Sequence, residues 1–107
     1  MIIYNVTLSI DDSIEQEWLT WMQTKHIPDV MSTGTFKECK LSRLLTGEEQ
    51  GGKAYSVLYV AFSQEGLDTY QSKDAPRLQN EHNLKFQGKF AAFRTELKLI
   101  EEFTYEG

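Results

Sequence analysis

The chain has 107 residues, of which 40% are hydrophobic and 25% charged, so it can form one hydrophobic core but not two. Its net charge of −5 (11 Lys and Arg against 16 Asp and Glu) is spread along the chain without a basic cluster, which disfavours nucleic acid and anionic membranes as partners. No apolar run is long enough for a membrane-spanning helix, there is no secretory signal, and the single cysteine cannot form an internal disulfide. We therefore expect one cytoplasmic domain over residues 1–107.

The first third of the chain predicts a strand followed by a bent helix. Residues 2–10 alternate between apolar and polar side chains, which is typical of a strand. Asp11 begins a group of N-cap candidates, and helical spacing follows over residues 13–25. Pro28 interrupts this helix and is suited to the first position of a new short helix, which Gly34 ends.

The middle of the chain predicts a β-hairpin. Residues 36–45 have the weak alternation and the charges of an edge strand. Residues 46–53 contain three glycines but no phosphate-binding motif, so they are expected to form the hairpin loop. Residues 54–62 are apolar on both faces, which predicts a central strand that is covered twice.

The last third predicts a helix and a long strand. Ser63 is expected to cap a helix that restarts at Pro76 and ends at Gly88. Residues 89–103 read as a final strand, and the tail from about residue 104 is expected to fray.

This order of elements predicts an α+β fold of the ferredoxin-like βαββαβ type: a four-stranded antiparallel sheet with two helices on one face. The first and third strands are expected at the centre, parallel to each other, with the second and fourth at the edges. The face without helices would carry Ile3, Tyr55, Val57 and Tyr59. Because a monomer should not expose so large an apolar patch, we expect a homodimer through this open face.

Five stretches resemble a bacterial family of short, uncharacterised proteins classed as a domain of unknown function: residues 1–6, 17–22, 26–30, 55–57 and 88–97. More distantly, the helix-one His followed by a Gly and strand two is similar to the dimeric α+β barrel superfamily, which includes YciI-like, EthD-like and antibiotic-biosynthesis-monooxygenase-like proteins. The resemblance implies two ferredoxin-like sheets packed face to face, with a cavity between sheet and helices or between the sheets. It implies no particular activity.

His26 and Asp29 are the candidate catalytic residues. A spacing of three lets a carboxylate contact an imidazole around a helical turn, and such a pair could supply a general acid or base. The pKa of His26 would then be raised, at the mouth of a pocket bounded by Trp21. Alternatively, His26 caps one helix and Asp29 begins the next. Trp18 should belong to the core and Trp21 should be partly exposed.

Further candidates follow from the monooxygenase-like resemblance, in which Asn5 and His82 would flank a substrate. The helix-two Trp of haem-degrading relatives has no counterpart, since Tyr70 is the nearest aromatic residue, and this argues against haem or quinol chemistry. Stacking of RNA bases on Tyr55 and Tyr59 fits poorly with the acidic chain. The candidate ligand-binding residues are Trp21, Asn5, Tyr55, Tyr59, His82 and Arg94.

No metal or cofactor is expected, because the spacing of His26, Asp29, Glu81 and His82 matches no zinc signature. The leading hypothesis is a homodimeric α+β barrel protein that binds a small, partly apolar molecule in a cavity. The alternative is a cofactor-free enzyme, monooxygenase- or YciI-like, with His26 as acid or base. The sequence leaves open whether the protein is an enzyme.

Overall fold

The computed structural model describes residues 1–46 and 53–107, so the expected hairpin loop over residues 46–53 falls largely outside the described residues. In the described residues the elements follow in the order β1 (Ile2–Ile10), η1 (Asp12–Ile14), α1 (Glu15–Trp21), η2 (Met22–His26), α2 (Ile27–Met31), β2 (Phe36–Arg43), β3 (Lys53–Ala61), α3 (Gln64–Lys73), α4 (Ala75–Lys85) and β4 (Phe90–Lys98).

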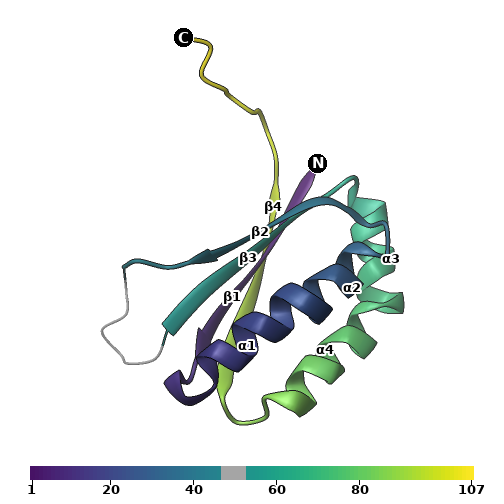
Figure 1. Cartoon of the computed structure of the whole chain (residues 1–107). Coiled ribbons are helices and arrows are strands. Elements are labelled where there is room, and N and C mark those ends of the chain that lie inside the picture. The colour runs from purple at the N-terminus through teal and green to yellow at the C-terminus, as the bar shows by residue number, and fades with distance from the viewer. Residues whose placement is uncertain (47–52) are drawn as a thin grey trace.

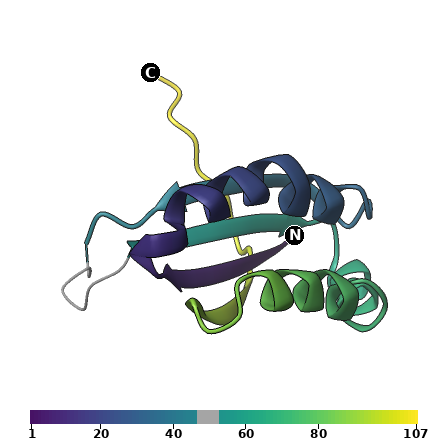
Figure 2. The same cartoon turned by 60° about the horizontal axis from the view of Figure 1, so that its bottom comes forward.

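The strands form one antiparallel sheet in the order β2-β3-β1-β4, and both helical segments lie on the same side of it (Figure 1). A view turned by 60° shows the two segments side by side over the strands (Figure 2). The α+β, ferredoxin-like fold is therefore confirmed. The prediction that the central strands run parallel is wrong: β1 and β3 are antiparallel. The reason is that the helical crossover returns β2 in the direction of β1, and β3 then reverses against β2.

The assignment of the faces of β3 was also wrong. Tyr55, Val57 and Tyr59 were expected on the open face, but they are at most 4% exposed, beneath the helices. Tyr59 lies opposite Tyr4 of β1, and opposite residues of paired strands share a face. Because β3 is apolar on both sides, its own alternation could not decide between the faces. The open face carries Ile3, Leu58, Val60, Phe93 and Leu97 instead.

The first helical segment is continuous through Pro28. The carboxylate of Asp11 accepts a hydrogen bond from the Ser13 N–H (2.9 Å), which caps the start as expected. Pro28 lies in the first turn of α2, but the preceding helix does not stop before it. Instead η2 is a wide π-helical turn, in which the Ile27 N–H reaches the Met22 carbonyl. A proline ring crowds the carbonyl four residues earlier, and a wider turn gives it room.

The second helical segment has the expected restart. Ser63 Oγ accepts a hydrogen bond from the Gly66 N–H (3.0 Å), and Pro76 lies in the first turn of α4. Gly88, with φ of +77°, reverses the chain into β4. The final strand ends at Lys98 rather than at Phe103, because Lys98 pairs with Ile2, where the partner strand β1 begins. Residues 99–107 continue away from the sheet without helix or strand (Figure 1).

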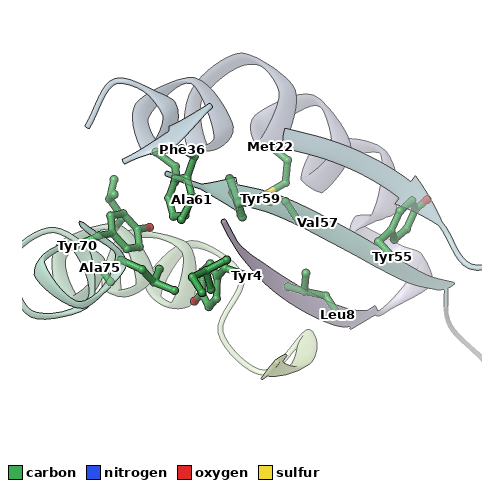
Figure 3. Packing of buried hydrophobic residues seen from close by; sticks show 14 of the residues in the cluster. Tyr4, Leu8, Met22, Phe36, Tyr55, Val57, Tyr59, Ala61, Tyr70 and Ala75 are labelled. Carbon is green, nitrogen blue, oxygen red and sulfur yellow. The ribbon is translucent and has the colours of Figure 1, made fainter. Parts of the chain in front are cut away.

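The core fills the layer between the sheet and the helices. Trp18 is fully buried and Trp21 is half-buried, which confirms the predicted difference between them. Figure 3 shows the side chains of Met22, Val57 and Tyr59 within this layer. Four aromatic rings near the ends of α2 and α3 pack with centroids 4.8–6.5 Å apart: Tyr4, Phe36, Tyr59 and Tyr70.

Candidate functional site

A cavity of about 40 Å³ lies between the helix-covered face of the sheet and the helices. That volume holds a few water molecules or one end of a small ligand. The wall is apolar at Val6, Met22 and Val57 and polar where the imidazoles and phenols meet. The described residues that line it are Tyr4, Val6, Leu8, Met22, His26, Val57, Tyr59, Tyr70, Gln79, His82, Asn83, Phe90 and Arg94.

His82 lies in α4 and is held by the core. The indole N–H of Trp18 donates a hydrogen bond to His82 Nε2 at 2.9 Å. Because an indole nitrogen is only a donor, Nε2 must be unprotonated, and the neutral ring carries its proton on Nδ1. Burial lowers the pKa of His82, as does the positive charge of Arg94 to a smaller degree. His82 is therefore a neutral imidazole whose Nε2 already has a partner.

His26 ends the π-helical turn and is not paired in this way. Its ring stacks on Trp21, with centroids 5.2 Å apart and an interplanar angle of 25°. Its Nδ1 atom is buried and has no hydrogen-bond partner among the described residues. Burial lowers the pKa of His26 to about 4, with a smaller contribution from His82, whose ring centroid is 5.7 Å away. The predicted rise in this pKa was wrong, and the imidazole is neutral near pH 7.

Asp29 does not orient His26. Its Oδ2 accepts a hydrogen bond from Lys25 Nζ at 2.6 Å, and Lys25 also lies 3.5 Å from Glu81. Lys25 is four residues earlier on the same helical segment and carries a full charge, whereas the His26 ring is turned inward onto Trp21. The expected His26–Asp29 pair is thus replaced by a surface ion pair.

The structure brings four of the candidate residues together at the cavity and places the others elsewhere. His26, Tyr59, His82 and Arg94 line the cavity, whereas Trp21 is absent from the lining although it contacts the His26 ring. Asn5 and Tyr55 were predicted to bind a ligand and do not line the cavity either.

Asn5 and Tyr55 have other partners. Asn5 lies opposite Leu58 on the open face, where its side chain bonds to Ser56 and Thr7. Tyr55 is buried against Trp18, and its hydroxyl donates to the Glu15 carboxylate. Asn5 was a candidate through the superfamily resemblance, and the place of Tyr55 depends on the register of β3, which its own alternation does not decide.

Several lining residues were not predicted from the sequence. Gln79 and Asn83 both lie on the cavity side of α4: counted from Gln79, His82 is three and Asn83 four residues later, and these spacings place residues on one face of a helix. Tyr4 shares the buried face of β1 with Leu8, and Tyr70 was considered only as an aromatic substitute. The helical spacing around His82 was a readable signal for the first two.

Neither a metal cluster nor a membrane span is found in residues 1–46 and 53–107. No three His, Cys, Asp or Glu side chains gather there in a way that could hold a metal ion. Among these same residues no helix has the length and apolar character needed to cross a membrane.

The fold is similar to that of solved structures described as dimeric ferredoxin-like proteins and antibiotic biosynthesis monooxygenases. A dimeric ferredoxin-like protein from an uncultured marine organism superposes with a TM-score of 0.72 at 9% identity, covering 95% of this chain and 97% of that one. An ethyl tert-butyl ether D (EthD) family protein from Bacillus halodurans gives 0.66 at 14% identity, with 92% and 100% covered. A candidate antibiotic biosynthesis monooxygenase from Deinococcus radiodurans gives 0.66 at 14% identity, covering both chains fully.

The sequence itself identifies the family. Residues 1–100 match the family model described as "Domain of unknown function (DUF4286)", and the chain belongs to this family. No curated protein matches the sequence. The solved structures share the fold at identities too low to transfer an activity.

Proposed function

We propose that this protein is a homodimer that binds a small, partly apolar molecule in the cavity between its sheet and its helices. The observation that carries this proposal is that His26 lines the cavity and that its buried Nδ1 has no hydrogen-bond partner among the described residues. An unsatisfied buried polar atom costs stability, about 1–3 kcal/mol in general, and a bound molecule would satisfy it.

The composition of the wall favours a partly apolar ligand. Val6, Met22 and Val57 provide apolar contact, and Met22 and Val57 are almost completely buried. A few convergent polar groups on an apolar wall are typical of small-molecule sites. The volume of about 40 Å³ limits what can enter without movement to a small molecule or to one end of a larger one.

The apolar open face supports the homodimer. Phe93 is 63% exposed and Leu97 is 46% exposed, beside the half-buried Ile3, Leu58 and Val60. A shallow depression lies next to Phe93 where the side chains on the open face are small: Ser9, Ala54 and Ala91. In a two-fold dimer, a protruding ring beside such a depression can fit the same surface on a second copy. The dimeric ferredoxin-like neighbours are consistent with this arrangement.

The binding proposal is tested by mass spectrometry of small molecules that remain bound through native purification. Val6→Phe adds a ring at the cavity wall, and Leu84→Phe adds one on the exposed surface of α4 as a matched control. We expect one compound to accompany the wild type and the Leu84→Phe variant and to be lost from Val6→Phe. A bound compound that Val6→Phe retains fully would place the site elsewhere.

The dimer is tested by light scattering at micromolar concentration. We expect twice the chain mass and an interface of about 800 Å² per partner, the standard size. Val60→Glu or Phe93→Glu should halve the mass, because each buries a charge in the proposed interface. Leu84→Glu, on the far side of the helices, should leave the dimer intact. A monomeric wild type would overturn this part of the proposal.

A second candidate function is cofactor-free catalysis with His26 as the proton acceptor. The same free Nδ1 favours it, because a neutral imidazole with an available nitrogen can accept a proton. With a pKa of about 4, His26 could deprotonate only a fairly acidic substrate. Catalysis predicts that His26→Asn abolishes conversion of the co-purified compound and leaves its binding measurable. Equal conversion by both proteins would exclude this role.

A further inference from the structure

Arg94 places a positive charge at a cavity that otherwise has an uncharged lining. It lies opposite Val6 in the β1–β4 pairing and so faces the helices. Its side chain lines the cavity and is exposed to solvent, so it occupies the mouth. Its positive charge lowers the pKa of His26 and of His82, with a smaller effect than burial.

The guanidinium of Arg94 is not held in an ion pair by any described residue. Within residues 1–46 and 53–107, Arg94 has no carboxylate oxygen within 4.0 Å. Glu96 faces the same side two residues later, and its Oε1 contacts Gln64 Nε2, which donates a hydrogen bond to it at 3.3 Å, rather than the Arg94 guanidinium. Arg94 therefore retains its fork of donors, whose geometry matches a carboxylate.

The rest of the lining can assist an anion without competing with it. Among the residues that the structure describes, no acidic side chain lines the cavity. Burial raises the pKa of Tyr70, so its hydroxyl stays protonated and can donate a hydrogen bond. An anion and a guanidinium beside a wall of low polarity attract each other more strongly than they would in bulk water.

We infer that the cavity takes a small carboxylic acid, whose carboxylate pairs with Arg94 at the mouth while its apolar chain lies against Val6, Met22 and Val57. This inference rests on the proposed function and specifies the chemical class of its ligand. With a net charge of −5, the chain as a whole repels anions, so its overall charge does not favour binding of a carboxylate. Binding of an acid must therefore come from the local site.

The test compares butyrate with butyramide, its uncharged counterpart of nearly equal size. Each is titrated at constant ionic strength, and binding is followed by NMR of the Met22 methyl group and the His26 imidazole. We expect butyrate to bind at least tenfold more tightly than butyramide. Arg94→Gln should remove this preference, and Arg94→Lys should retain part of it because the charge remains without the bidentate geometry.

Lys98→Gln is the matched control for charge. Lys98 is four residues along the same strand and on the same face, about 13 Å from Arg94, and it does not line the cavity. The Lys98→Gln variant should bind butyrate as tightly as the wild type does. Circular dichroism of each variant establishes that it is folded.

The titrations with butyrate and butyramide can contradict the acid inference without contradicting small-molecule binding. Equal affinity for the two probes, or a preference that Arg94→Gln retains, would overturn the acid inference and leave small-molecule binding intact. Absence of any response to both probes would also overturn it, and the mass-spectrometric experiment with Val6→Phe would then decide the proposed function separately.

Discussion

The two histidines mark two regions of one helix–sheet interface that are built differently. Both rings line the cavity, but the region from His82 Nε2 to Trp18 and Tyr55 is closed, since Trp18 Nε1 donates a hydrogen bond to Nε2 and the ring centroids of Trp18 and Tyr55 are 5.0 Å apart. His26 instead keeps a buried Nδ1 without a partner among the described residues. The comparison shows that burial alone does not identify a functional histidine; what separates the two is whether the hydrogen-bonding capacity of the ring is already used.

The largest expected effect lies in the closed region. Trp18→Ala should lower the free energy of unfolding by about 3–5 kcal/mol, because it removes a fully buried side chain and leaves His82 Nε2 without its donor. Trp21→Ala should cost clearly less, since Trp21 is only half-buried. Urea unfolding of both variants measures the difference. Equal losses would mean that the two regions do not differ in the way described.

The next largest effect is the dependence of stability on pH that His26, in the cavity lining, causes. His26 has a pKa of about 4 when folded and about 6.5 when unfolded, so below pH 6.5 the unfolded chain binds more protons. Stability should therefore be complete above pH 6.5 and fall as the pH drops toward 4, by up to about 3 kcal/mol from this group, given 1.36 kcal/mol per unit of pKa.

His26→Phe provides the control for this pH dependence. It keeps an aromatic ring against Trp21 and removes the titrating group. Its stability should change less between pH 6.5 and 4 than that of the wild type, and the remaining slope belongs to His82 and the carboxylates. Identical slopes in the two proteins would show that His26 is not buried in the uncharged form.

The smallest expected effect is that of Asp29 on the pKa of His26. Asp29 attracts the charged imidazole only weakly, and its carboxylate is paired with Lys25. Asp29→Asn should therefore lower the pKa of His26 slightly, and this pKa should lie far below 6.5 in both proteins, as measured by NMR titration. A pKa above 6.5 in the wild type that drops in the variant would restore Asp29 as the partner of His26.

Local patterns in the sequence predicted the fold well. The alternation in residues 2–10, the cap at Asp11 and the restart at Pro76 each depend on neighbouring residues, and each is present. The face of β3 depends on which strand lies beside it, and no local pattern carries that information when both faces are apolar.

The candidate site was less predictable for the same reason. His26 was a candidate because its spacing of three from Asp29 is that of two residues in contact around a helical turn. Its lack of a partner depends on residues distant in sequence, and the Trp18–His82 hydrogen bond joins residues 64 apart. Arg94 reaches the cavity through its register with Val6, which only the assembled sheet defines.

The most direct test of the difference between the two regions follows both imidazoles and the Trp18 indole N–H by ¹⁵N NMR while butyrate or butyramide is added. If the His26 region is the binding site, the His26 resonances should move with saturation, whereas the Trp18 indole should keep the shift of its hydrogen bond to His82. Movement of the indole resonance with an unchanged His26 would contradict the assignment of a structural role to one histidine and a binding role to the other.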